Sequence, residues 1–134
     1  MEEEITVHIE AEVNPTEDEA KVKSAMENIF SSLQFEVKPL KRGCLLTAKT
    51  GGTDGLTKLY NLLRRDRIRD ATRSVLYKGI NGQSIIFYLN KQVAYAGHVS
   101  FSQPSGESPL GPISVEIQCE DPRKIIDWLA PRTA

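Results

Sequence analysis

Hydrophobic and polar residues alternate strictly near the start of the chain. Odd positions from 5 to 13 hold Ile, Val, Ile, Ala and Val, whereas even positions from 4 to 12 hold Glu, Thr, His, Glu and Glu. A period of two predicts a strand with one buried face. Apolar residues then recur at helical spacing from Val22 to Leu33. They follow Thr16 and Glu19, whose spacing predicts a capping box at the start of a helix.

The middle of the chain continues this alternation of element types. Phe35 to Val37 and Cys44 to Lys49 are apolar extended segments around a Pro/Gly turn, which predicts a hairpin. Apolar residues then recur at helical spacing over residues 56–63 and again over 68–76, but the two apolar stripes lie on different faces of the helix. One straight helix cannot bury both, so we predict a break near Asp66 or Arg67 and a C-terminal cap at Gly79.

The last third of the sequence predicts more strands and a final helix. Residues 83–89 form a strand that is apolar on both sides, since Ile86 and Tyr88 lie opposite its regular apolar face. This predicts a cover on each side, one made by helices and the other by a partner subunit or a folded-over sheet. Residues 99–101 and 113–119 are further strands, and Asp121 and Pro122 begin a helix that ends before Pro131.

Together these elements predict a fold class. We expect residues 1–134 to form a single α+β domain, with one mostly antiparallel sheet of five or six strands and three or four helices on one face. The two cysteines are in phase with inward-facing positions, which predicts buried reduced thiols. Because Ile86 and Tyr88 need a cover, we also expect a homodimer.

Charge is distributed unevenly although the formal net charge is only −1. Residues 1–20 hold eight acids and no Lys or Arg, whereas residues 38–91 hold twelve basic and three acidic residues. Such a basic middle attracts polyanions. The longest apolar run, 85–89, is far too short for a membrane span, and no targeting signal is visible, so we expect a cytoplasmic protein.

An arginine cluster at the predicted helix break is the strongest candidate for chemistry. Guanidinium groups match phosphate oxygens geometrically, so we predict binding of structured RNA. The predicted contacts are Arg64, Arg65, Arg67, Arg69 and Arg73, aided by Lys41, Arg42 and Lys91. The alternative is a solvated helix face with ion pairs at i, i+3, in a homodimeric protein-interaction or scaffold module that binds no nucleic acid.

Catalytic and cofactor motifs are missing from the sequence. The glycine run at 51–55 lacks the pattern of a P-loop or dinucleotide fingerprint, and His8 and His98 stand apart from other candidate ligands. We therefore expect no enzymatic activity, no cofactor and no metal. The segment from Ser102 to Pro112, rich in Pro, Gly and Ser, is a candidate recognition loop, and the alternative is a plain connection between two strands.

Several segments resemble an archaeal family of small uncharacterised proteins. They are 14–17, 28–30, 62–70, 89–92, 99–101, 108–113 and 126–131, which span nearly the whole chain. The resemblance implies a fold similar to that of the large-subunit ribosomal protein that binds 5S RNA. It also implies a role as a predicted RNA-binding or exosome-associated protein. Asp66 and Arg69 depart from the Gln and Leu of the family pattern, which makes this copy more charged.

Overall fold

The computed structural model describes residues 4–103 and 111–132, which form six strands and six helical segments. The strands are β1 (Thr6–Val13), β2 (Gln34–Pro39), β3 (Cys44–Gly51), β4 (Ile80–Asn81), β5 (Ser84–Asn90) and β6 (Pro112–Gln118). The helices are α1 (Glu19–Ile29), α2 (Gly52–Gly55), α3 (Thr57–Arg65), α4 (Arg69–Lys78), α5 (Lys91–Tyr95) and α6 (Pro122–Leu129).

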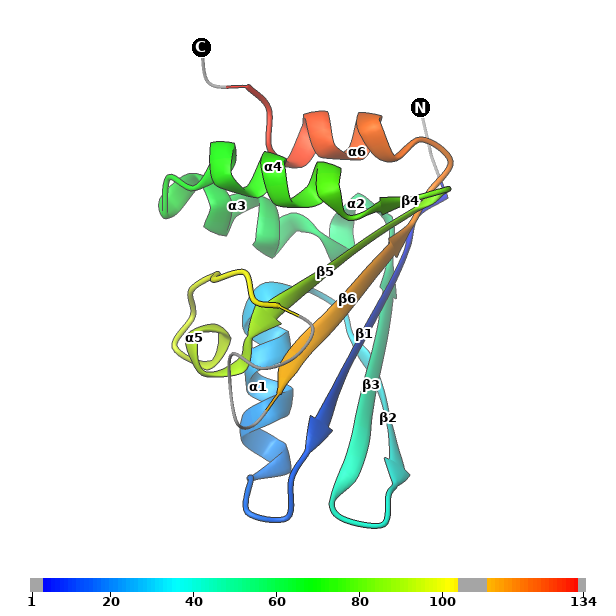
Figure 1. The fold of residues 1–134 in the computed structure, drawn as a ribbon, viewed down its shortest axis with the longest axis vertical. Coiled ribbons are helices and arrows are strands. Elements are labelled where there is room, and N and C mark those ends of the chain that lie inside the picture. Colours follow the sequence, from blue (N-terminus) through cyan, green and yellow to red (C-terminus); the bar gives the residue numbers. More distant parts are fainter. Residues whose placement is uncertain (1–3, 104–110, 133–134) are drawn as a thin grey trace.

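The strands form one open sheet in the order β2-β3-β1-β6-β5-β4, and every neighbouring pair is antiparallel. Viewed along its edge, the sheet carries all the helices on one face and leaves the other face bare (Figure 1). The predicted α+β class and the number of strands are confirmed, but the predicted strand at residues 99–101 is only an isolated bridge between Phe101 and Leu89, and the sixth strand is the two-residue β4. The predicted helix number was too low, because the one-turn α2 and the short α5 are too brief to show a helical period.

The central strand β1 explains why one face is covered. Its odd positions are all buried, and Ile9 lies in register with Ala48 of β3 and Val115 of β6, so small and branched side chains form a continuous apolar layer. Against this layer α1 packs Met26 and Ile29, which are fully buried. The even positions of β1 face away from the helices, as the alternation predicts.

The start of α1 differs from the prediction. Asp18 rather than Thr16 is the N-cap, and its carboxylate accepts a hydrogen bond from the amide of Ala20 at 2.9 Å. Glu17 instead folds back on Asn14, whose backbone amide donates to its Oε1 at 2.9 Å. The predicted capping box of Thr16 and Glu19 is therefore wrong. Glu17 stabilises the turn before the helix, and Asp18 is the N-cap residue.

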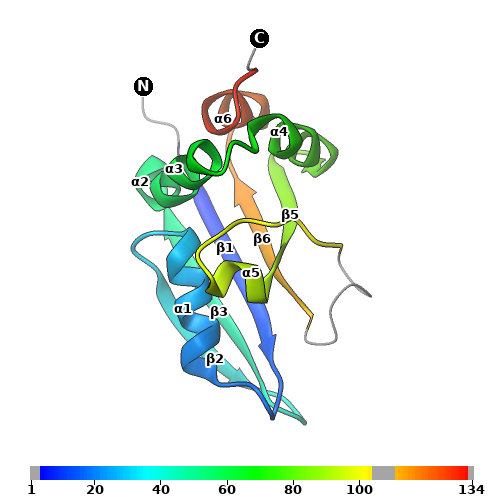
Figure 2. The ribbon, with the colours of Figure 1, turned by 90° about the vertical axis from the view of Figure 1, so that its left-hand side faces the viewer.

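Two helical groups cover different parts of the sheet. In Figure 2, α1 and α5 lie over the lower half, whereas α2, α3, α4 and α6 gather across the upper end. Gly79 caps α4 as predicted, and a side chain there would clash, because a Cβ would lie 2.1 Å from the carbonyl oxygen of Ile86. None of the described helices has the length and apolar character needed to cross a membrane.

Three further predictions can be compared with the described residues. Neither cysteine forms a disulfide within the described part of the chain, and Cys119 is buried while Cys44 is half-buried. Ile86 and Tyr88 are half-exposed on the bare face, and no helix of the described chain lies over that face (Figure 1). The candidate recognition loop at 102–112 falls mostly on residues 104–110, which lie outside the described part.

Candidate nucleic-acid interface

The predicted break between the two helices lies at residues 66–68 and has a defined geometry. Helix α3 ends at Arg65, and the amide of Ile68 donates to the carbonyl of Leu63 at 3.2 Å while that of Arg67 donates to Arg64 at 3.3 Å. This pair of bonds is a Schellman motif, whose central residue adopts a left-handed conformation and is usually glycine. Here that residue is Arg67, with φ of 56°.

Arg64 is fixed by the C-terminal end of α6. Its Nη1 donates to the carbonyl oxygens of Tyr60 at 3.0 Å and Leu129 at 3.2 Å, and its Nη2 donates to that of Trp128 at 3.4 Å. Its guanidinium carbon also lies 3.4 Å from the centre of the Tyr60 ring. The last carbonyls of a helix lack partners within the helix and attract cations, so Arg64 satisfies both needs.

Arg73, on α4, contacts the same C-terminal end of α6. Its Nη1 donates to the carbonyl oxygen of Ala130 at 3.1 Å and lies 2.8 Å from Oδ1 of Asp127. The side chain is only 17% exposed. We call Arg64 and Arg73 together the α6 clamp, because they join α3 and α4 to the end of α6. Both guanidinium groups, predicted as RNA contacts, already have internal partners, so each has a structural role in this fold.

Arg65 extends from the end of α3 to the segment that follows α5. Its Nε lies 3.0 Å from Oδ1 of Asp66, and its Nη2 donates to the carbonyl oxygen of Gly97 at 2.6 Å. Nδ1 of His98 lies 3.1 Å from the same Nη2 and 3.3 Å from Oδ2 of Asp66. The hydrogen bond from Arg65 is the main cause that lowers the pKa of Asp66 below its ordinary value. Arg65 thus has partners but keeps half of its surface in solvent.

Arg67 and Arg69 differ from their neighbours. Among the described residues, neither side chain has a hydrogen-bond or ion-pair partner, and Arg67 is exposed while Arg69 is half-exposed. Asp66 and Arg69 have the i, i+3 spacing of the alternative interpretation but form no ion pair, because Asp66 is engaged by Arg65 and His98. We call Arg65, Arg67 and Arg69 the α3–α4 corner.

The three assisting residues do not join this corner. Lys41 and Arg42 are exposed in the turn between β2 and β3, at the end of the sheet opposite α3 and α4 (Figure 1). Lys91 is 5% exposed and donates from Nζ to the backbone of Glu12 and to Glu17 at 3.0 Å. Its predicted contact with RNA needs correction, because a buried ammonium with an internal carboxylate partner cannot reach a ligand.

Sequence reasoning missed a second basic feature beside the clamp. A hollow of about 470 Å³ between α4 and α6 is lined by Asp70, Arg73, Ser74, Tyr77, Arg123 and Arg132. Arg123 and Arg132 are exposed, and their side chains have no partner among the described residues. They are about fifty residues from the arginine cluster in sequence, so only the packing of α6 against α4 brings them near it.

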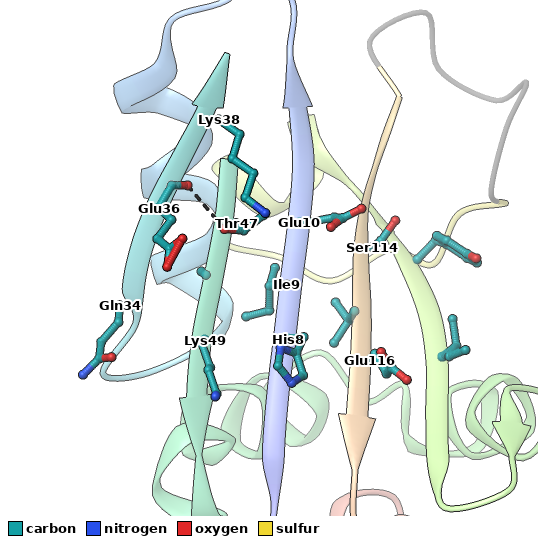
Figure 3. Close-up of a pocket in the computed structure, with 14 residues that line it drawn as sticks. His8, Ile9, Glu10, Gln34, Glu36, Lys38, Thr47, Lys49, Ser114 and Glu116 are labelled. Carbon is teal, nitrogen blue, oxygen red and sulfur yellow. Dashed lines mark hydrogen bonds between the residues drawn. The ribbon is translucent and has the colours of Figure 1, made fainter. Parts of the chain in front are cut away.

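The bare face of the sheet has the opposite character. Its hollow of about 570 Å³ crosses five strands and exposes Glu10, Glu36 and Glu116 beside Lys38 and Lys49 (Figure 3). In this view Lys38 reaches across Thr47 toward β1, and the two lysines lie over β2 and β3 while Glu10 and Glu116 lie over β1 and β6. With three acids against two bases among its described lining, this face offers little attraction to a polyanion.

These observations define a class: an α+β protein with an open antiparallel sheet, helices on one face, and a basic surface concentrated in α3, α4 and α6. A family model described as "RNA binding" matches residues 6–119. The chain belongs to the archaeal UPF0201 family, as the resemblance predicted.

Individual relatives cover nearly the whole chain. It is 48% identical over 127 residues to the UPF0201 protein TK1335 of Thermococcus kodakarensis, covering 95% of this chain and 90% of that protein. It is 46% identical over 123 residues to PAE1632 of Pyrobaculum aerophilum, covering 91% and 86%. The crystal structure of a UPF0201 protein from Methanococcus jannaschii superposes with a TM-score of 0.87 at 41% identity, covering 96% and 95%.

Proposed function

We propose that this protein binds the phosphate backbone of structured RNA through the α3–α4 corner, without catalysing a reaction. The observation that carries the proposal is that Arg67 and Arg69 remain without partners among the described residues, although Arg64, Arg65 and Arg73 of the same segment are engaged. Exposed guanidinium groups on a rigid helix junction suit phosphate oxygens. The description of the family model as RNA binding supports the same conclusion.

The aromatic side chains favour structured RNA over single strands. Tyr60 and Trp128 stack on each other with ring centres 4.8 Å apart, and the guanidinium group of Arg64 also lies over the Tyr60 ring. A single-strand platform needs free ring faces for the bases. Because these rings already have internal partners, recognition rests on backbone phosphates, which a folded RNA presents in a fixed arrangement.

A fluorescence anisotropy titration with ribosomal RNA hairpins at two salt concentrations tests this proposal. The double variant Arg67→Glu/Arg69→Glu should bind at least about tenfold more weakly, and the slope of log affinity against log salt should fall by about two. Lys41→Glu is the matched control, because it reverses a charge at the other end of the sheet. Equal and negligible binding by all three proteins would contradict the proposal.

We propose as a second candidate a homodimeric protein-interaction module that pairs through the bare sheet face. The specific observation is that Ile86 and Tyr88 are half-exposed on a face that also carries both acidic and basic side chains. Two copies facing each other would cover the apolar pair and match opposite charges. Light scattering should give a dimer for the native chain and a monomer for Tyr88→Glu, whereas a strict monomer at high concentration excludes this candidate.

A further inference from the structure

We propose that the hollow between α4 and α6 seats one phosphate group of the RNA backbone. This inference deepens the proposed function and rests on it. The hollow is lined by three arginines, and Asp70 is the only acid among its described lining residues. None of these arginines belongs to the pair that carries the proposed function, so the seat is a separate contact.

Arg73 contributes an immobilised guanidinium group to the lining of the hollow. Its bonds to Asp127 and Ala130 hold the guanidinium in one place, and its Nη2 lies 3.4 Å from the hydroxyl oxygen of Tyr77. A cation that is already ordered loses little conformational entropy when a ligand arrives. Its charge is partly offset by Asp127, so Arg73 positions the site rather than supplying its whole attraction.

Arg123 and Arg132 supply the exposed guanidinium groups that would bind the phosphate. Both are exposed and lack side-chain partners among the described residues, and they approach the hollow from the two ends of α6. Two forked guanidinium groups can contact different oxygens of one tetrahedral phosphate. The amides at the start of α6 take no part, because Asp121 accepts hydrogen bonds from those of Arg123 at 3.2 Å and Lys124 at 3.4 Å.

The position of the hollow connects it to the α3–α4 corner. Arg69, Arg73 and Tyr77 are spaced four residues apart along α4 and so lie on one face of that helix. Arg69 and Arg73 are separated by about 6 Å along the helix axis, at 1.5 Å per residue. One RNA strand that contacts Arg69 is therefore well placed to present a neighbouring phosphate to the hollow.

The ligand chemistry is a phosphodiester rather than a nucleotide. Tyr77 is the only aromatic residue among the described lining, and the guanidinium carbon of Arg73 lies 5.0 Å from its ring centre. The hollow thus offers cations for phosphate oxygens but no free ring pair to hold a base.

The test combines two titrations of the full chain. Binding of inorganic phosphate is measured by the NMR shifts of arginine Nε–H groups. Binding of the RNA hairpin is measured by fluorescence anisotropy. In wild type, phosphate should shift the signals of Arg123 and Arg132, and Arg123→Gln/Arg132→Gln should weaken RNA binding about tenfold. The matched control Arg42→Gln, made in the distant β2–β3 turn, should bind RNA like wild type.

The outcomes separate the seat from the proposed function. If Arg67→Glu/Arg69→Glu weakens RNA binding but Arg123→Gln/Arg132→Gln does not, the seat is wrong and the function stands. If phosphate shifts the arginines of the hollow but no RNA binds to wild type, the assignment to RNA is wrong together with the proposed function. Absence of any phosphate-induced shift at Arg123 and Arg132 overturns the seat directly.

Discussion

The α6 clamp and the α3–α4 corner contain the same residue type within ten positions of sequence, yet their surroundings differ. Arg64 and Arg73 reach the end of α6 and bind its carbonyl oxygens, whereas Arg67 and Arg69 point to no acceptor among the described residues. The difference shows that some arginines of one segment have a structural role while others remain available to bind a ligand. An arginine becomes structural when the unsatisfied carbonyl groups of a helix end lie within its reach.

Lys91 gives the extreme case of a structural cation and the largest expected effect. Its ammonium is 5% exposed and its partner Glu17 is 11% exposed. Replacing Glu17 by Gln leaves a buried charge without its counterion, so the free energy of unfolding should fall by about 3 kcal/mol. Urea denaturation measures this loss. Glu19→Gln, which breaks the exposed pair with Lys23, should cost no more than about 0.5 kcal/mol, and equal losses would contradict the assignment.

The same pair predicts a pH dependence. Burial acts to raise the pKa of Glu17, but hydrogen bonds from Asn14 and Lys91 outweigh it and hold the pKa below the ordinary value of 4.5. A lowered pKa means that the carboxylate contributes stability above pH 4.5, and that this contribution is lost as pH falls through the lower folded value. The stability difference between wild type and Glu17→Gln should therefore be constant near neutrality and shrink below pH 4.5.

Breaking the α6 clamp should have the next largest effect. Arg64→Ala removes donors from the carbonyls of Trp128 and Leu129, and the free energy of unfolding should fall by about 2 kcal/mol, typical of hydrogen bonds from a charged group. Arg64→Lys should restore little, because an ammonium cannot reproduce the planar fork. Arg69→Ala is the matched control and should change stability by less than about 0.5 kcal/mol. RNA affinity should respond in the reverse order, weakened in Arg69→Ala and kept in folded Arg64→Ala.

Most of the fold was predictable because local patterns and tertiary packing agree. Strand β1, the β2–β3 hairpin, the helix break at residues 66–68 and the start of α6 at Asp121 all follow from short-range rules of alternation, turns and caps. Helix α5 escaped prediction because five residues do not complete a recognisable period. The same reason applies to α2.

The candidate site was predictable only in part. Composition located the arginine cluster, but the engagement of Arg64 and Arg73 depends on α6, which lies more than fifty residues later in the chain. The burial of Lys91 likewise depends on Glu17, which is 74 positions away. Long-range partners of this kind leave no local signal in a single sequence. Arg123 and Arg132 were missed for the same reason.

Arg67 tests whether the corner keeps an unfavourable conformation for a purpose. It holds the left-handed position of a Schellman motif, with φ of 56°, where glycine has no steric penalty. Arg67→Gly should therefore raise the free energy of unfolding by about 1 kcal/mol while weakening RNA binding. Ser32, with φ of 58°, offers the matched control: Ser32→Gly should stabilise similarly without changing RNA affinity. Destabilisation by Arg67→Gly would show that its side chain has a structural partner.

Substitution of Asp66 is expected to give the smallest effect, which lowers stability and raises RNA affinity. Its carboxylate contacts Arg65 and His98, and the pKa lowered chiefly by the Arg65 hydrogen bond keeps it charged at neutral pH. Asp66→Asn should cost about 0.5 kcal/mol of stability, as for other exposed pairs. It also removes the negative charge that precedes Arg67 in the sequence and the ion-pair partner of Arg65, so RNA affinity should rise about twofold at low salt and less at high salt. If instead affinity falls, Asp66 is needed to orient Arg65 toward the RNA, and the corner works through an ordered arginine rather than through free ones.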